Sequence, residues 1–421
     1  MSFAKLCQTV VVVLLLGLLS VGSAFAARNK KEAKADPMFP NATREEPKIK
    51  LSPALGKKLE VLADLAQEDK NDEVIKLGDE IIANKRAGNY EKSFAYQSQG
   101  FAWVNKDDYT KAIPLLQKAL DTNGLGNDNH YQIMFQIAQM YLSEEQYNES
   151  LKVLDRFLAE TKSVKPEYLA MKGNALYRLE RYDEAAVLLR KAIETSDKPQ
   201  SSWSQLLMAS YFDQDKPLEA AKIAEEMLAK NPDDKAMLVN LSSIYAQADQ
   251  YDKAIEVLER GRSKGLLTEE RDYRQLYALY LNSEGKEANG ISVINEGLQK
   301  NILKPSSEIY IALGQAYYFS DKITESIDAY RKALPLAKDG EPALNLARVL
   351  TNEEDYAGAK SAAQEALKKG VKKPGDAWMV IGRAEFGLGN KAGLVAAYKE
   401  AAKFPETKQQ ATEWLRKNGS K

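Results

Sequence analysis

The sequence has very little of the chemistry that catalysis and metal binding need. It contains one cysteine, Cys7, and one histidine, His130. A zinc site built from thiolates and imidazoles is therefore excluded, and nucleophilic catalysis lacks its usual base or thiol. His130 stands at an expected helix start, where a solvated polar residue is ordinary. The sequence predicts a protein that is not an enzyme, with no catalytic residue, no cofactor and no metal ion.

Phosphate-binding loops and basic stripes are also missing. The nearest glycine cluster, Asn123-Gly124-Leu125-Gly126-Asn127, lacks the lysine of a phosphate cradle and is interpreted as a loop joining helices. The 59 Lys and Arg residues balance 60 Asp and Glu residues. Their signs alternate along the chain, as on solvated helix faces. Without the basic surface that nucleic acids require, we expect no nucleic-acid partner.

The one long apolar run, from Val10 to Leu19, is too short to cross a bilayer, which needs about 20 residues. It follows Lys5 and precedes small residues in the pattern of a signal-peptidase site. We interpret residues 1–26 as a signal peptide cleaved after Ala26. The protein is then exported, with no membrane span and no cysteine after cleavage. Its stability must come from packing rather than from disulfides.

The chain changes character twice after that segment. Residues 27–51 are charged, contain three prolines and show almost no apolar periodicity, which predicts a disordered leader. Ser52-Pro53 then has the form of a helix start. We expect a pair of N-terminal capping helices over residues 52–92.

Residues 93–404 repeat at a period of about 35, each unit being a helix pair. One clear unit runs from Tyr168 to Ala192, and another from Gln99 to Ala119, with matching spacings. A small residue marks the second helix of each unit, except that the last unit carries leucine. The marks are Ala112, Ser150, Ala185, Ala220, Ala254, Gly290, Ser326, Ala359 and Leu394.

This pattern resembles the tetratricopeptide repeat (TPR) family, whose second helix opens with a Tyr-x-x-Ala step. The resemblance implies an all-α fold: a right-handed α-solenoid, or superhelix, of about nine helix-turn-helix repeats. One repeat alone cannot cover its apolar face, so the ends need capping. Residues 405–421 are expected to form the C-terminal capping helix and tail.

The family implies a concave groove lined by the first helix of each repeat. Amide side chains there can bond a peptide backbone, and arginines can bind carboxylates. Carried onto this sequence, the groove positions are Gln97, Phe101, Phe135, Gln139, Asn174, Arg178, Gln205, Gln275, Gln315, Arg348 and Arg383. The expected partner is a protein or peptide bound in this groove. Exposed helix residues without a ligand are the alternative interpretation.

The chain as a whole resembles periplasmic TPR proteins encoded beside TonB energy-transduction systems, a likeness prompted by residues 76–119. That resemblance implies a periplasmic, non-catalytic scaffold accessory to TonB-dependent transport, with a TonB-system component as a partner. One alternative is a general scaffold for envelope-assembly or peptidoglycan enzymes. Another is an enzyme or glycan-binding protein, which would need acidic and aromatic residues clustered on the groove.

Overall fold

The computed structural model describes residues 36–49 and 51–418 of the chain. Within those residues the structure contains α-helices and one short 3-10 helix but no β-strand. None of the described helices is both long enough and apolar enough to span a bilayer. The expected signal peptide lies outside the described residues. The chain divides into two compact units, one ending at Ala229 and the other beginning at Lys230.

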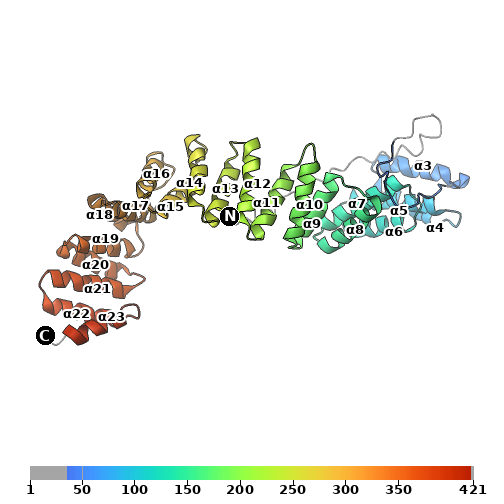
Figure 1. The fold of residues 1–421 in the computed structure, drawn as a ribbon. Coiled ribbons are helices and arrows are strands. Elements are labelled where there is room, and N and C mark those ends of the chain that lie inside the picture. The colour runs from blue at the N-terminus through green and yellow to red at the C-terminus, as the bar shows by residue number, and fades with distance from the viewer. Residues whose placement is uncertain (1–35, 50, 419–421) are drawn as a thin grey trace. The chain divides into compact units, whose positions relative to one another are not determined.

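The first unit is a stack of helix pairs in which each odd-numbered helix is followed by its even-numbered partner (Figure 1). Its helices are α3 (Pro53–Gln67), α4 (Asn71–Ala83), α5 (Asn89–Val104), α6 (Tyr109–Asp121), α7 (Asn127–Ser143), α8 (Tyr147–Thr161), α9 (Pro166–Arg178), α10 (Tyr182–Thr195), α11 (Ser201–Asp213) and α12 (Pro217–Lys230).

The second unit continues the same pattern and closes with a single helix. Its helices are α13 (Lys235–Gln247), α14 (Tyr251–Ser263), α15 (Glu270–Leu281), α16 (Glu287–Gln299), α17 (Ser307–Phe319), α18 (Ile323–Ala333), the 3-10 helix η1 (Leu334–Leu336), α19 (Glu341–Asn352), α20 (Tyr356–Lys369), α21 (Pro374–Gly387), α22 (Lys391–Ala401) and α23 (Lys408–Asn418). Trp414 of α23 packs on Tyr398 with a ring separation of 4.2 Å.

The turn inside each helix pair has one residue with a left-handed backbone. These residues are Asp69, Asp107, Glu145, Glu180, Asp215, Asp249, Gly285, Asp321, Glu354 and Gly389. In the α5–α6 turn, the amide of Asp108 bonds the carbonyl oxygen of Trp103 at 3.0 Å. Such a bond closes the end of the first helix and reverses the chain. The recurring turn fixes the antiparallel packing of each pair.

The nine marks predicted from the sequence lie at one structural position, the fourth residue of the second helix, and all are buried. A small residue here lets the paired helices approach closely. The hydroxyl of Ser150 donates to the carbonyl oxygen of Ala138 at 2.8 Å, across the two helices of one pair. Ser326 donates in the same way to Gly314 at 2.7 Å. The predicted repeat register and the α-solenoid class are confirmed.

Two glycines of the first helices show how close the approach is. A Cβ atom added at Gly173 would lie 2.8 Å from Cγ of Leu189, and one added at Gly100 would lie 2.5 Å from Cγ of Leu116. Both distances are shorter than carbon atoms tolerate unless the leucine side chain or its helix shifts. Glycine is therefore needed at these positions for packing.

Residues 36–49, here called the strap, correct the expectation of a disordered leader. The strap has no regular secondary structure, yet it packs on α7, α8 and α9 through Phe39, whose side chain is only 4% exposed. Burial of one phenylalanine contributes up to about 3 kcal/mol, and hydrogen bonds such as that from the amide of Thr43 to the backbone oxygen of Glu160 add to the docking of the strap. Composition and periodicity do not register a single anchoring side chain. Residues 27–35 of the expected leader lie outside the described residues.

Candidate peptide-binding surfaces

The eleven predicted groove residues all lie on first helices of the pairs, from α5 to α21. The structure gives them unequal access to solvent. Exposed side chains are Gln205, Gln315, Arg348 and Arg383, whereas Gln139, Asn174, Arg178 and Gln275 are half-buried. The remaining three, Gln97, Phe101 and Phe135, are buried or packed against the core.

The aromatic groove candidates of the first unit belong to the core. Phe135 contacts Tyr168 edge-on, with 4.7 Å between the ring centroids, and lies 5.6 Å from the ring of Phe157. Phe101 packs against the same cluster. Gln97 is 6% exposed, and its side-chain oxygen accepts no hydrogen bond from the described part of the protein. These residues can shape a surface, but they offer little of themselves to a partner.

The first helices of the second unit present a more accessible surface. Gln315, Arg348 and Arg383 directly follow the buried small residues of α17, α19 and α21, so the repeat register places them on one face. Phe319, four residues after Gln315, is 72% exposed, and Phe386, three residues after Arg383, is 74% exposed. Residues three or four apart on a helix lie on the same side. We call Gln315, Phe319, Arg348, Arg383 and Phe386 the open face.

Sequence reasoning missed the two phenylalanines of the open face. The aromatic residues of the chain fall at helical spacing, which favours assignment to the core. The signal that could have found Phe319 and Phe386 is their position at the C-terminal ends of first helices, one turn beyond a predicted groove residue. Phe319 lies on α17 and Phe386 on α21, with the α19–α20 pair between them, and large exposed apolar side chains gathered on one face are typical of interaction surfaces.

The two arginines of the open face differ in their bonding. Arg348 donates to a carboxylate oxygen of Asp376 at 2.8 Å and to the side-chain oxygen of Asn345 at 3.2 Å. Arg383 forms no ion pair within residues 36–49 and 51–418. A guanidinium group without a carboxylate can bind one from a partner by two parallel hydrogen bonds.

A second surface is already occupied by the chain itself. The ring of Phe39 lies 5.4 Å from the ring of Tyr131, 5.7 Å from that of Phe157 and 6.2 Å from that of Tyr168. The first two pairs are edge-on and the third is stacked, and such pairs contribute about 0.5–1.5 kcal/mol each beyond burial. These three rings come from α7, α8 and α9, so the strap links consecutive repeats. We call the surface under the strap the strap site.

Polar groups hold the rest of the strap in register. The amide of Thr43 donates to the backbone oxygen of Glu160 at 2.8 Å. The side-chain amide of Asn127 donates to the backbone oxygen of Arg44 at 3.1 Å. A carboxylate oxygen of Glu46 accepts from the backbone amide of Asn127 at 3.1 Å, where the dipole at the start of α7 favours negative charge. An extended segment is thus recognised through its backbone and a few side chains.

His130 is not the solvated residue that the sequence suggested. Its side chain is 2% exposed, and its ring contacts the ring of Tyr131 edge-on at 5.3 Å. Burial, reinforced by the positive charges of Arg44 and Arg156, lowers the pKa of His130 to about 3. The strap covers the first turn of α7, and the sequence did not predict this packing. His130 is therefore neutral at physiological pH.

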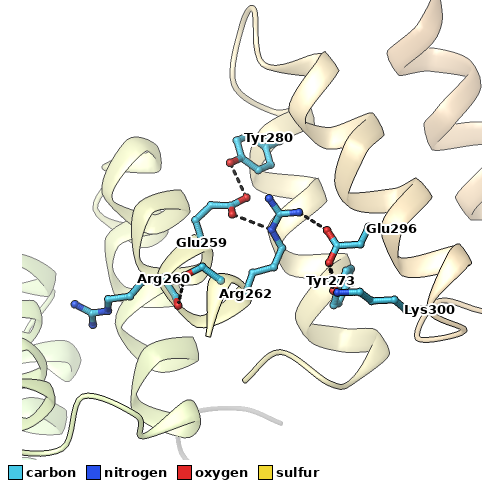
Figure 2. A network of polar contacts seen from close by, with 8 residues as sticks. Glu259, Arg260, Arg262, Tyr273, Tyr280, Glu296 and Lys300 are labelled. Carbon is cyan, nitrogen blue, oxygen red and sulfur yellow. Dashed lines mark hydrogen bonds and ion pairs between the residues drawn. The ribbon is translucent and has the colours of Figure 1, made fainter. Parts of the chain in front are cut away.

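A polar network between repeats of the second unit shows a different use of charged groups (Figure 2). Arg262 of α14 donates to Glu259 of the same helix at 2.8 Å and bonds Glu296 of α16. Tyr273 and Tyr280 of α15 donate to Glu296 and Glu259, each at 2.8 Å. Burial and the bond to Glu259 raise the pKa of Tyr280 to about 12. The network joins neighbouring repeats and leaves its charges paired.

No cluster of three or more His, Cys, Asp or Glu side chains suited to a metal ion occurs in the described part of the chain. The candidate surfaces are built from aromatic, amide and arginine side chains. Their arrangement provides apolar contact and hydrogen bonds.

Family models support the repeat assignment. Models of the tetratricopeptide repeat match residues 211–279, 307–339 and 344–409. A model described as anaphase-promoting complex, cyclosome, subunit 3 matches residues 105–192. None of these models describes a catalytic family. No curated protein matches the sequence. The chain therefore contains tetratricopeptide repeats, a fold that generally serves as a scaffold for protein–protein interaction.

Solved structures with detectable likeness include other repeat proteins. A tetratricopeptide repeat protein from Parabacteroides merdae is 14% identical, with a TM-score of 0.37, over 62% of this chain and 99% of that chain. YrrB, described as a TPR protein with an unusual peptide-binding site, is 13% identical, with a TM-score of 0.38, over 47% and 99%. MamA from Desulfovibrio magneticus is 19% identical, with a TM-score of 0.36, over 43% and 99%.

Proposed function

We propose that this protein is a non-catalytic scaffold that binds a protein or peptide partner through the open face. The observation that carries the proposal is the exposure of Phe319 and Phe386, at 72% and 74%. Two phenylalanines left in water by one stack of repeats cost hydration free energy that a partner recovers by covering them. Aromatic anchors of this kind dominate the binding energy of many interfaces.

The residues around these anchors indicate the chemistry of the partner. Arg383 and Arg348 lie on the same face, and Arg383 forms no ion pair with the described part of the chain. A segment with apolar side chains spaced by acidic residues would place its apolar groups on the phenylalanines and a carboxylate on Arg383. Gln315 adds an amide that can bond the backbone of such a segment.

Site-specific photo-cross-linking in the native host tests this proposal. A photoreactive residue is placed at position 319, at position 386 or, as a control, at position 187. Val187 is 68% exposed on α10, which is a second helix of the first unit. We expect positions 319 and 386 to capture the same protein and position 187 not to capture it. Equal capture from all three positions, or none from 319 and 386, overturns the proposal.

A narrower proposal concerns the place and the process. We propose that the scaffold is periplasmic and accessory to a TonB-dependent transport system. The apolar run from Val10 to Leu19 with its small-residue cleavage pattern supports export, and the sequence resemblance supports the TonB link. A protein recovered with the cytosolic fraction contradicts export. Normal siderophore-dependent growth of a deletion strain, with no TonB-system component cross-linked, contradicts the transport role and leaves the open-face proposal standing.

A further inference from the structure

A polar hollow lies where the strap meets the body of the first unit. It has a volume of about 580 Å³, within the usual range of small-molecule pockets. The strap contributes Thr43 and Arg44, and the body contributes His130, Arg156 and Glu160, among others. The hollow is therefore complete only when the strap is docked.

The imidazole of His130 is the unusual group in this hollow. The side chain is 98% buried, since 2% remains exposed, and neither ring nitrogen has a hydrogen-bond partner in the described part of the protein. Buried polar side chains are nearly always hydrogen-bonded. His130 is such an exception, and it lines the hollow, which points to a ligand that donates or accepts hydrogen bonds.

The charges around His130 indicate the sign of that ligand. The guanidinium group of Arg44 bonds only neutral acceptors, which are the side-chain oxygens of Asn123 and Asn127 and the backbone oxygen of Leu125. Burial is the largest cause of the lowered pKa of His130. The positive charges of Arg44 and Arg156 lower that pKa further. Both arginines line the hollow and disfavour a positive charge on the imidazole ring.

The carboxylates that line the hollow are already engaged. Glu160 accepts from Nε of Arg156 at 2.7 Å, and Asp121 accepts from the side-chain amide of Gln117 at 2.9 Å. The side chain of Arg156 is half-exposed and lines the hollow. A guanidinium group and a neutral imidazole N–H group together suit an oxygen-bearing anion.

We propose that this hollow binds a small oxyanion, a phosphate or a carboxylate, between Arg156 and His130. Thr43 and Arg44 of the strap line the same hollow, so the bound anion stabilises the docked strap, and a docked strap strengthens anion binding. The site is separate from the open face and does not depend on the proposed partner.

The test uses His130 as its own reporter, because it is the only histidine in the chain. Inorganic phosphate is titrated into the full-length mature protein while the imidazole resonance is followed by NMR, and acetate is titrated in parallel. We expect a saturable shift with at least one of them. Saturation by phosphate alone indicates a phosphate site, and saturation by acetate alone indicates a carboxylate site. No saturable shift with either anion overturns the proposal.

Three variants distinguish the site from non-specific effects. Arg156→Gln should weaken binding about tenfold by removing a charge-assisted contact. Arg331→Gln, in the second unit and 60% exposed, should leave it unchanged. Phe39→Ala, which removes the strap anchor at a distance from the anion, should also weaken it. An undiminished affinity in Arg156→Gln overturns the anion site, and an undiminished affinity in a folded Phe39→Ala variant overturns the coupling to the strap.

Discussion

Phe39 and Phe319 are both phenylalanines on the surface of a repeat stack, and their environments are opposite. Phe39 is 4% exposed because three aromatic rings of consecutive repeats surround it, whereas Phe319 is 72% exposed at the end of α17. The strap site holds an extended segment of the same chain, whereas Phe319 and Phe386 of the open face are left exposed by residues 36–49 and 51–418. The repeat fold thus provides both an occupied and an unoccupied surface of similar chemistry.

The polar groups of the two surfaces also differ, because those of the strap site have bonding partners and one charged group of the open face has no ion-pair partner among the described residues. In the strap site, Asn127 bonds the strap backbone and Glu46 bonds the first turn of α7. On the open face, Arg383 forms no ion pair with the described residues. On this scaffold the bound strap is held by one buried aromatic anchor, by backbone hydrogen bonds that include one from an amide side chain, and by a charge placed at a complementary group.

The largest effect on the free energy of unfolding is expected from the close packing of paired helices, which supports both surfaces. Gly173→Leu forces a side chain where even a Cβ atom would lie 2.8 Å from Leu189, so it should lower the free energy of unfolding by about 3 kcal/mol. Arg348→Ala, on the exposed open face, should change it by less than about 0.5 kcal/mol. Thermal unfolding followed by calorimetry measures both. Equal melting temperatures contradict the repeat register.

The anchors themselves should separate the two surfaces. Phe39→Ala removes a buried ring and should lower the stability of the first unit by about 3 kcal/mol or release the strap. Phe319→Ala removes a ring that is mostly in water and should be nearly neutral. Limited proteolysis detects strap release, and denaturant unfolding measures stability. If the two variants behave alike, the strap is not anchored as described.

A smaller effect is expected at the start of α7. Glu46→Gln removes the negative charge from a helix N-terminus where Glu46 accepts the amide of Asn127, and should weaken strap docking by about 0.5–1 kcal/mol. Glu45→Gln is the matched control, since Glu45 is exposed and adjacent. Hydrogen exchange at the first turn of α7 reports the difference. Faster exchange in both variants would indicate a general charge effect.

The smallest effects on stability are expected from the pH dependence of the polar network shown in Figure 2. The pKa of Tyr280 is raised from 10.0 to about 12 by burial and its bond to Glu259, so its contribution to stability is present below pH 10 and is lost as pH rises toward 12. Against the effect of burial, bonds from Lys300 and Tyr273 lower the pKa of Glu296 below 4.5. Its contribution is present above pH 4.5 and is lost as pH falls through the lowered value.

Variants isolate these two contributions. In a series of urea midpoints against pH, Tyr280→Phe should flatten the alkaline loss of stability, and Glu296→Gln should flatten the acid loss. Neither change should affect the strap site, which lies in the other unit. Unaltered profiles in both variants would show that the network does not support the repeats.

The sequence predicted the repeats well because their signal is redundant. Ala112, Ser150 and Ala185 each carry the same packing constraint, so an error at one position is corrected by the others. The strap carries no such redundancy. Phe39 is a single aromatic residue in a charged segment, and only the tertiary structure shows that it lies against Tyr131. The solvated assignment of His130 failed for the same reason, because the strap that covers it was not expected to pack.

The sequence predicted which helices carry the groove residues, but it did not predict which of their side chains are exposed. All eleven predicted residues lie on first helices, which the repeat register determines. Whether a side chain at such a position faces solvent depends on the size of its neighbours, so Phe135 turned into the core while Phe386 remained exposed. Residue type alone could not distinguish these two phenylalanines.

The most direct test of the account is the affinity of the cross-linked partner for a double variant of the open face. Isothermal calorimetry compares the wild-type protein with Phe319→Ala/Phe386→Ala and with Arg331→Gln as a control. We expect a loss of affinity of about tenfold or more in the double variant, with an unchanged melting temperature, and no loss in the control. Wild-type affinity in a folded double variant would contradict the assignment of the open face as the binding surface.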